Sequence, residues 1–178
     1  MNNHKAKNLL KGSRTFDWVF IALLTAINII LQGPLTLHVG SDIKIGFSFL
    51  PIVIGAYYYG ILGGVLVSGL GDFITAFVFP TGAFNPLFTV TAIIVGLLFG
   101  LFLRGKINIL NIILAVVSTQ IICSLILNSL WIAVCYINIS AFPAQVVARL
   151  VQVIPSIPVQ IILIPIIIEA ALKRININ

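Results

Sequence analysis

The chain has 178 residues, of which 60% are hydrophobic and only 8% are charged, and its mean hydropathy is +1.19. A soluble domain carries roughly a quarter charged residues, so ten Lys and Arg and four Asp and Glu side chains are too few to coat a water-soluble fold of this length. The net charge of +6 comes from short basic clusters outside the apolar segments rather than from a basic stripe, which excludes a nucleic-acid groove.

Apolar segments separated by Gly, Pro and charged residues predict an all-α integral membrane protein, a bundle of six transmembrane helices. The length leaves no room for a soluble module, so residues 1–178 are predicted to form a single integral membrane domain. In chain order the predicted spans are 16–32, 47–61, 63–79, 87–103, 109–136 and 146–172.

The basic residues predict the orientation of these spans. They gather before the first span, between the fourth and fifth, and after the last, and with six spans all three places lie on one side of the membrane. Since Lys and Arg accumulate on the cytoplasmic side, both termini are predicted to be cytoplasmic. The clustered residues are Lys5, Lys7, Lys11, Arg14, Arg104, Lys106, Lys173 and Arg174.

Two features of the first span and the loop after it bear on function. Ala22 and Ala26 form a small-x-x-x-small pair, which packs against another helix of the chain or docks a partner protein. The loop 33–46 alternates apolar and polar residues on either side of Gly-Ser-Asp, which predicts a short hairpin-like lid on the outer side. An exposed hairpin without a ligand role is the alternative.

Asp72 lies about halfway through the third span, where a charge costs about 2.5 to 3.5 kcal/mol. Gly69 and Gly71 flank it and allow another backbone or a flat ligand to come close. Asp72 is therefore a candidate ligand-binding residue. The alternative is a structural carboxylate, bonded to nearby backbone donors or paired with Arg149.

Polar residues recur at helical spacing in the last two spans, so that each span presents one polar face. Lipid cannot satisfy amide and guanidinium groups, which favours a cavity wall over a lipid-facing surface. Hydrogen bonds between helices are the alternative, and they explain Ser124 and Gln160 well. The two faces consist of Gln120, Ser124, Asn128, Trp131 and Cys135, and of Arg149, Gln152, Ser156 and Gln160.

Several chemistries lack the residues they need. The two histidines, His4 and His38, lie outside the spans, so neither a metal cluster nor a Ser-His or Cys-His dyad is expected within the bundle. No Gly-x-x-x-x-Gly-Lys loop is present to bind a nucleotide. We therefore expect neither an enzyme nor a metal or cofactor site, and any transport needs a partner that supplies energy.

A set of motifs spread over most of the chain points to a known family. They are Phe49-Leu50-Pro51, Gly55, Tyr59-Gly60, Gly71-Asp72, the segment from Pro80 to Thr89, Asn128-Ser129-Leu130-Trp131, and Arg149 with Pro155. In these motifs the chain resembles the substrate-binding S components of energy-coupling factor (ECF) vitamin transporters, and within them the folate-specific branch. The pantothenate branch is similar in the same motifs and is the alternative, as is a structural membrane subunit without a ligand.

The resemblance implies a protein of the prokaryotic plasma membrane that binds a vitamin, here folate, from outside. A transmembrane coupling (T) subunit, engaged through Ala22 and Ala26, and two ATPases that use ATP would power release inward. Asp72 would hold the pterin ring, and Phe84 and Trp131 would stack on the flat rings. Arg149, Lys44 or both would meet the glutamate carboxylates. The full set of predicted substrate-binding residues is Lys44, Phe47, Asp72, Phe84, Asn85, Asn128, Trp131, Arg149 and Gln152.

Overall fold

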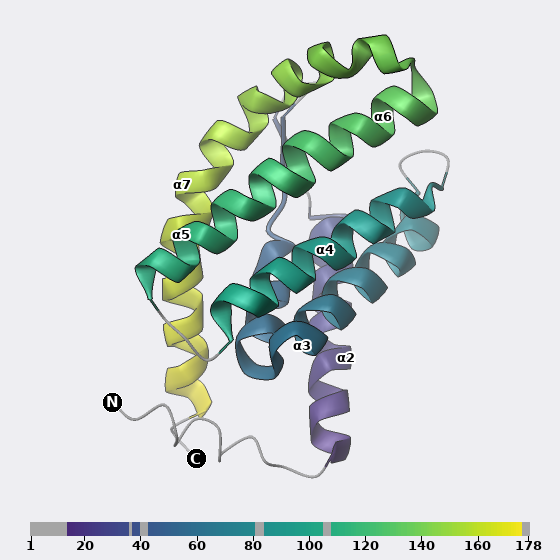
Figure 1. Ribbon diagram of the computed structural model, residues 1–178. Coiled ribbons are helices and arrows are strands. Elements are labelled where there is room, and N and C mark those ends of the chain that lie inside the picture. The colour runs from purple at the N-terminus through teal and green to yellow at the C-terminus, as the bar shows by residue number, and fades with distance from the viewer. Residues whose placement is uncertain (1–13, 36, 40–42, 81–83, 105–107, 176–178) are drawn as a thin grey trace.

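The computed structural model describes residues 14–175, with gaps at 36, 40–42, 81–83 and 105–107. Within them, five helical stretches are long and apolar enough to cross a membrane, which makes the chain a multi-pass membrane protein (Figure 1). The helices are α2 (Arg14–Gln32), α3 (Phe49–Val78), α4 (Pro86–Leu103), α5 (Ile109–Ser118) with α6 (Asn128–Tyr136), and α7 (Phe142–Ile175).

Helix α3 contains both the second and the third predicted spans, and the chain reverses inside it. Gly60 has φ 67° and ψ −144°, a conformation outside the helical region that favours glycine. A Cβ atom built on Gly55 would lie 3.1 Å from Cγ2 of Val67, although twelve helical residues would separate them by about 18 Å. The segments before and after Gly60 therefore lie against each other, as the ribbon of α3 shows (Figure 1).

Helices α3 and α4 pack through their backbones. A Cβ atom added to Gly64 would collide with the carbonyl group of Gly96, and one added to Gly96 would collide with Gly64 and with the Ser68 hydroxyl. Only glycine permits this approach, and it places the part of α3 that follows Gly60 directly beside α4.

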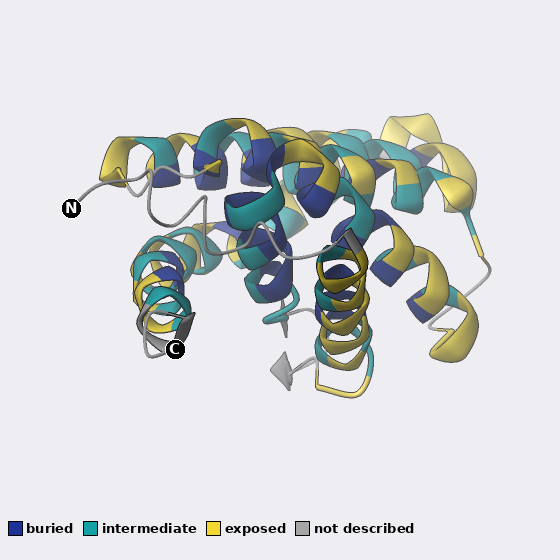
Figure 2. Ribbon diagram, turned by 90° about the horizontal axis from the view of Figure 1, so that it is seen from below, coloured by how far each residue is buried: buried dark blue, intermediate teal, exposed yellow. Residues whose placement is uncertain are grey.

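The core lies where the helices meet, and the outward sides of the helices are exposed (Figure 2). Buried apolar side chains from α3, α4, α5 and α7 form one cluster that includes Val67, Phe99, Ile112 and Ile164. Large apolar side chains such as Trp18 and Leu62 point outward, which suits a lipid-facing surface.

Helices α5 and α6 form one uninterrupted run because the segment between them, Thr119–Leu127, is a π-helix (η1). The run covers residues 109–136, as predicted, and it contacts α7 along its length. A short 3-10 helix, η2 (Ile139–Ala141), lies between the end of α6 and the start of α7.

The predicted helix ends need small corrections. Helix α7 begins at Phe142 instead of residue 146. Pro143 is tolerated there because the N–H groups of a first turn make no hydrogen bond within the helix. Helix α7 ends at Ile175 instead of residue 172, and α2 and α4 begin one or two residues before their predicted starts. Three prolines lie inside α7 at Pro155, Pro158 and Pro165.

A β-hairpin follows α2. Strands β1 (Leu37–Val39) and β2 (Ile43–Ile45) are antiparallel, with Leu37 opposite Ile45. They lie within the loop for which the alternating pattern predicts a hairpin-like lid. The tip between the strands and the side chains of both strands are outside the described residues.

Candidate ligand-binding site

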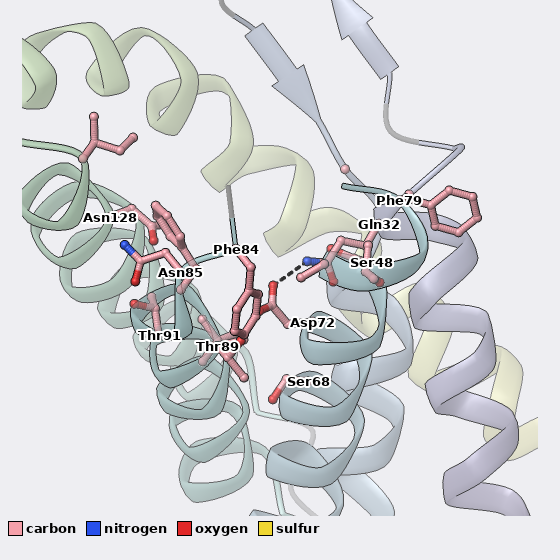
Figure 3. A pocket seen from close by; sticks show the side chains of 18 of the residues that line it. Gln32, Ser48, Ser68, Asp72, Phe79, Phe84, Asn85, Thr89, Thr91 and Asn128 are labelled. Carbon is pink, nitrogen blue, oxygen red and sulfur yellow. Dashed lines mark hydrogen bonds between the residues drawn. The ribbon is translucent and has the colours of Figure 1, made fainter. Parts of the chain in front are cut away.

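A cavity of about 830 Å³ lies between α2, α3, α4, α6 and α7. Ligand pockets measure about 300 to 1,000 Å³, so this cavity has room for a vitamin-sized molecule. Its wall combines apolar side chains with a carboxylate, a guanidinium and several amides and hydroxyls. Figure 3 shows the carboxylate of Asp72 among the amides and hydroxyls.

Asp72 is held in this wall by two neutral donors. Gln32, the last residue of α2, donates from Nε2 to Oδ1 at 2.7 Å, and Thr89 in the first turns of α4 donates from Oγ1 to Oδ2 at 3.0 Å (Figure 3). A carboxylate oxygen has two acceptor sites, so each oxygen keeps one for a further donor. Within the described residues these bonds run to Gln32 and Thr89, and none recorded for Asp72 runs to Arg149.

Arg149 lines the same cavity from α7 and is half-buried. Its Nε atom is buried and has no hydrogen-bond partner among the described residues. A buried guanidinium is costly unless an acceptor meets it. The cavity therefore presents a cation that is open to an anionic group, together with Gln152, which lies one turn further along α7.

Aromatic contacts position Phe84 at the cavity. Its ring centroid lies 4.8 Å from that of Phe77 and 5.9 Å from that of Phe73, and Phe84 is one of the lining residues. The two α3 rings therefore form a support behind Phe84, which leaves its other face toward the cavity (Figure 3).

Trp131 lies behind the wall. Its Nε1–H donates to Oγ1 of Thr91 at 3.0 Å, and Thr91 is a lining residue. Among the described lining residues Trp131 itself is absent. The hydrogen bond links α6 to α4 and fixes the Thr91 hydroxyl.

The remaining predicted residues fall into three groups. Asn85 and Asn128 line the cavity, and Asn85 also caps α4, because its side-chain oxygen accepts from the Leu87 N–H at 3.0 Å. Phe47 is half-buried and packs against the apolar core. Lys44 belongs to β2, and its side chain lies outside the described residues.

Ala22 and Ala26 occupy a different surface. Both are exposed on α2, whereas the opposite side of the same helix is buried and includes Leu24 and Asn28. Asn28 donates from Nδ2 to the Ser48 carbonyl at 2.8 Å and so ties α2 to the start of α3.

Sequence reasoning missed several lining residues. Gln32, Ser48, Thr91 and Tyr136 line the cavity without having been predicted to bind a ligand. Gln32 and Tyr136 stand at the ends of apolar runs, where a polar residue looks like a helix boundary. Thr89 belonged to a family motif, and only its contact with Asp72 indicates what it does.

Metal binding finds no support in the described residues, which contain no group of three His, Cys, Asp or Glu side chains that could hold an ion. The chemistry that this arrangement allows is binding. A carboxylate, a guanidinium, amides and an aromatic ring face one cavity, from α2, α3, α6 and α7 and from the residues that precede α4.

Comparison with known proteins is consistent with that arrangement. Residues 17–176 match the family model of the ECF transporter, substrate-specific component. The folate transporter FolT of Clostridium novyi (strain NT) is 26% identical over 147 residues, which cover 82% of this chain and 84% of that protein. The folate transporter FolT of Leuconostoc mesenteroides subsp. mesenteroides is 29% identical over 153 residues, which cover 83% of this chain and 81% of that protein.

A crystal structure of FolT bound with folic acid has a similar fold. Its TM-score is 0.74 at 24% identity, and the match covers 86% of this chain and 91% of that one.

Proposed function

The chain belongs to the family of ECF transporter substrate-specific components, and from that premise we propose that it is the folate-binding subunit of such a transporter. The curated relatives are folate transporters and a similar fold has been solved with folic acid, which supports this ligand. The observation that carries the proposal is the cavity with Asp72 and Arg149 in its wall, because folate is a flat heterocycle with an anionic tail.

In this proposal Asp72 holds the pterin ring. The ring presents an amino group and a ring N–H side by side, and a carboxylate can accept from both. Gln32 and Thr89 each occupy one acceptor site of the carboxylate, which fixes its plane and leaves one site on each oxygen. This geometry suits a two-point contact with a planar edge.

Arg149 binds the glutamate tail in the same proposal. Its Nε atom has no partner among the described residues, so a ligand carboxylate would remove the cost of a buried, unmatched cation. Lys44 is proposed to assist from the hairpin.

Phe84 and Trp131 are proposed to contact the flat rings, and Phe84 has the direct position at the cavity. The amides of Asn85, Asn128 and Gln152, together with Phe47, complete the proposed binding residues.

Direct binding tests the ligand assignment. Equilibrium dialysis of the purified protein with radiolabelled folic acid should give saturable binding, and Asp72→Asn should weaken it at least tenfold, since a charge-assisted hydrogen bond contributes about 1.5 to 3 kcal/mol. Asp17→Asn is the matched control, because Asp17 accepts from Tyr59 on α3 and lies outside the cavity wall. An Asp72→Asn affinity within about threefold of the unmodified protein would exclude the proposed role of Asp72.

We further propose that residues 1–178 form a single domain that crosses the prokaryotic plasma membrane six times, with both termini in the cytoplasm. The reversal at Gly60 supports two crossings within α3. In a chain whose native cysteines, Cys123 and Cys135, are replaced by Ser, Asn138→Cys should react with an impermeant maleimide on intact cells. Arg104→Cys should react only after permeabilisation, and equal labelling of both would contradict this topology.

Docking on a coupling subunit is proposed for the surface that contains Ala22 and Ala26. Both side chains are exposed and small, so a partner helix can come close. Ala22→Leu with Ala26→Leu should keep folate binding but lose co-purification with the transmembrane coupling subunit and its two ATPases. Ala170→Leu, an exposed alanine on α7, should keep both. Retention of the complex by the double variant would show that docking uses another surface.

A further inference from the structure

A second, smaller cavity of about 180 Å³ adjoins the main one, and we call it the inner chamber. The two cavities share four wall residues, Gly46, Ser48, Ile52 and Val95. The remaining wall of the inner chamber comes from Phe49, Phe99, Thr119, Gln120, Ser124 and Gln160.

The order of residues along each helix places the inner chamber deeper than the main cavity. The run through α5 and α6 contributes Asn128, Ile132 and Tyr136 to the main cavity and residues 119–124 to the inner chamber. Helix α7 contributes Gln152 to the first and Gln160 to the second. Along both helices the inner chamber is therefore further from the connection 137–141, which joins them at the outer end of the cavity (Figure 1).

The inner chamber contains two glutamines, and its Thr119 hydroxyl already donates to the Ala115 carbonyl. Gln120 is only 8% exposed, and among the described residues neither Gln120 nor Gln160 has a recorded side-chain hydrogen bond. An amide buried inside a membrane protein costs several kcal/mol if it stays unpaired. Gln120 of η1 is buried and Gln160 of α7 is half-buried, and both line one small space, so the inner chamber is suited to receive a hydrogen-bonding group.

The lack of charged residues in the chamber wall indicates which part of a ligand the chamber can bind. Its described lining residues contain amides, hydroxyls and apolar side chains and no charged residue, whereas the main cavity has Asp72 and Arg149. A carboxylate tail would lack a cation there, but the ring nitrogens and carbonyl of a neutral heterocycle can accept from amide N–H groups. Hydroxyl and amide side chains at the π-helical segment fit such a role, since π-helical turns are frequent at functional sites.

We propose that the inner chamber is the subsite for the acceptor edge of the ligand's heterocycle, with Gln120 and Gln160 as hydrogen-bond donors. This inference rests on the proposed folate-binding function. Asp72 takes the donor edge of the ring in the main cavity, the inner chamber takes the carbonyl and ring nitrogens, and the glutamate tail lies outward at Arg149. The ligand thus enters with its ring first.

Ligand fragments test this orientation. Competition against radiolabelled folic acid should be measured with folic acid, with pteroic acid, which keeps the ring and lacks the glutamate, and with p-aminobenzoylglutamate, which lacks the ring. Gln120→Leu and Gln160→Leu should each weaken folic acid and pteroic acid by about tenfold and leave p-aminobenzoylglutamate within about threefold. Arg149→Met should instead weaken folic acid and p-aminobenzoylglutamate and spare pteroic acid.

Gln145→Leu is the matched control, since Gln145 is a half-buried amide of α7 that belongs to neither described cavity wall. It should leave all three affinities unchanged, and a thermal midpoint that is not lowered in any Leu variant shows that the fold is kept. Affinities of both Gln120→Leu and Gln160→Leu within threefold for folic acid, or a loss confined to p-aminobenzoylglutamate, would overturn the assignment of the chamber. Failure of the unmodified, ligand-free protein to bind folic acid would instead overturn the proposed function itself, and the inference with it.

Discussion

Helices α3 and α7 face each other across the cavity, and they are held in different ways. In an 18-residue apolar segment of α3, 39% of the residues are buried within the protein. In the corresponding segment of α7 the share is only 17%. Helix α3 packs on α4 through glycine backbones, while α7 carries three internal prolines and several polar side chains. The site thus combines a firmly packed wall, which holds Asp72, with a loosely packed wall, which holds Arg149 and Gln152.

This difference indicates how the protein uses its ligand. The α3 and α4 side is arranged before binding, since the Asp72 carboxylate already has two fixed donors. The α7 side contains the Nε atom of Arg149, which has no recorded partner among the described residues, so a ligand that contacts both sides should tie α7 to the rest of the bundle. The predictions below test the two sides separately.

The largest effect is expected from Gly96→Val on the firmly packed side. The new Cβ atom would collide with the backbone of Gly64 and with Ser68, and α3 and α4 would have to separate. We expect a destabilisation of about 3 kcal/mol or more, with loss of monodisperse protein in detergent. Gly46→Ala is the control, because its nearest neighbouring atom is 3.8 Å from the added Cβ. Normal thermal unfolding of Gly96→Val would disprove the tight contact.

Ligand binding should affect the other side most. At a free folic acid concentration of 1,000 times Kd, the protein should gain about 4.1 kcal/mol of stability. Hydrogen exchange followed by mass spectrometry should show the gain in protection concentrated in residues 142–160 of α7 and smaller in residues 61–78 of α3. An equal gain in protection of the two segments would contradict the difference in packing between the α3 wall and the α7 wall.

Arg149→Met should change stability and binding in opposite directions. Removing a half-buried cation whose buried Nε atom has no partner among the described residues should stabilise the ligand-free protein by about 1 to 2 kcal/mol, seen as a higher thermal midpoint. The affinity for folic acid should fall about tenfold in the same variant. Arg104→Met, at an exposed position after α4, serves as the control and should do neither. A lower thermal midpoint for Arg149→Met would mean that the guanidinium already has a stabilising partner.

The smallest effect is expected at the single neutral hydrogen bond that joins α6 to α4. Trp131→Phe removes the bond to Thr91 and should cost about 1 kcal/mol of stability. Trp18→Phe, at a position 62% exposed on α2, should change little in the same unfolding measurement. Equal effects of the two substitutions would show that this bond contributes nothing to the link between α4 and α6.

The sequence predicts the membrane-embedded helices well because hydrophobic length carries that information locally. The run 109–136 has the predicted ends, and Asp72 and Arg149 face one cavity as their cost in a bilayer indicates. The joining of two predicted spans at Gly60 depends on one backbone conformation, which the glycines at 60, 63 and 64 permit but do not specify.

Contacts between distant residues account for most of what sequence reasoning missed. Gln32 and Asp72 are forty residues apart, as are Trp131 and Thr91, and no local pattern reports either pair. The sequence places Gln120 and Gln160 on the polar faces of two helices. Only the packing of η1 against α7 shows that they line a separate chamber. The π-helical segment has no counterpart in the sequence prediction.

The most direct test of the account uses Trp131 as its own reporter. In a Trp18→Phe background Trp131 is the sole tryptophan, and it lies directly behind the cavity wall at Thr91. Titration of the purified, ligand-free protein with folic acid should change its fluorescence saturably at nanomolar concentrations, while pantothenate, riboflavin and thiamine leave it unchanged. A saturable response to one of the other vitamins, or silence to all four, would contradict a folate-binding cavity between the two walls.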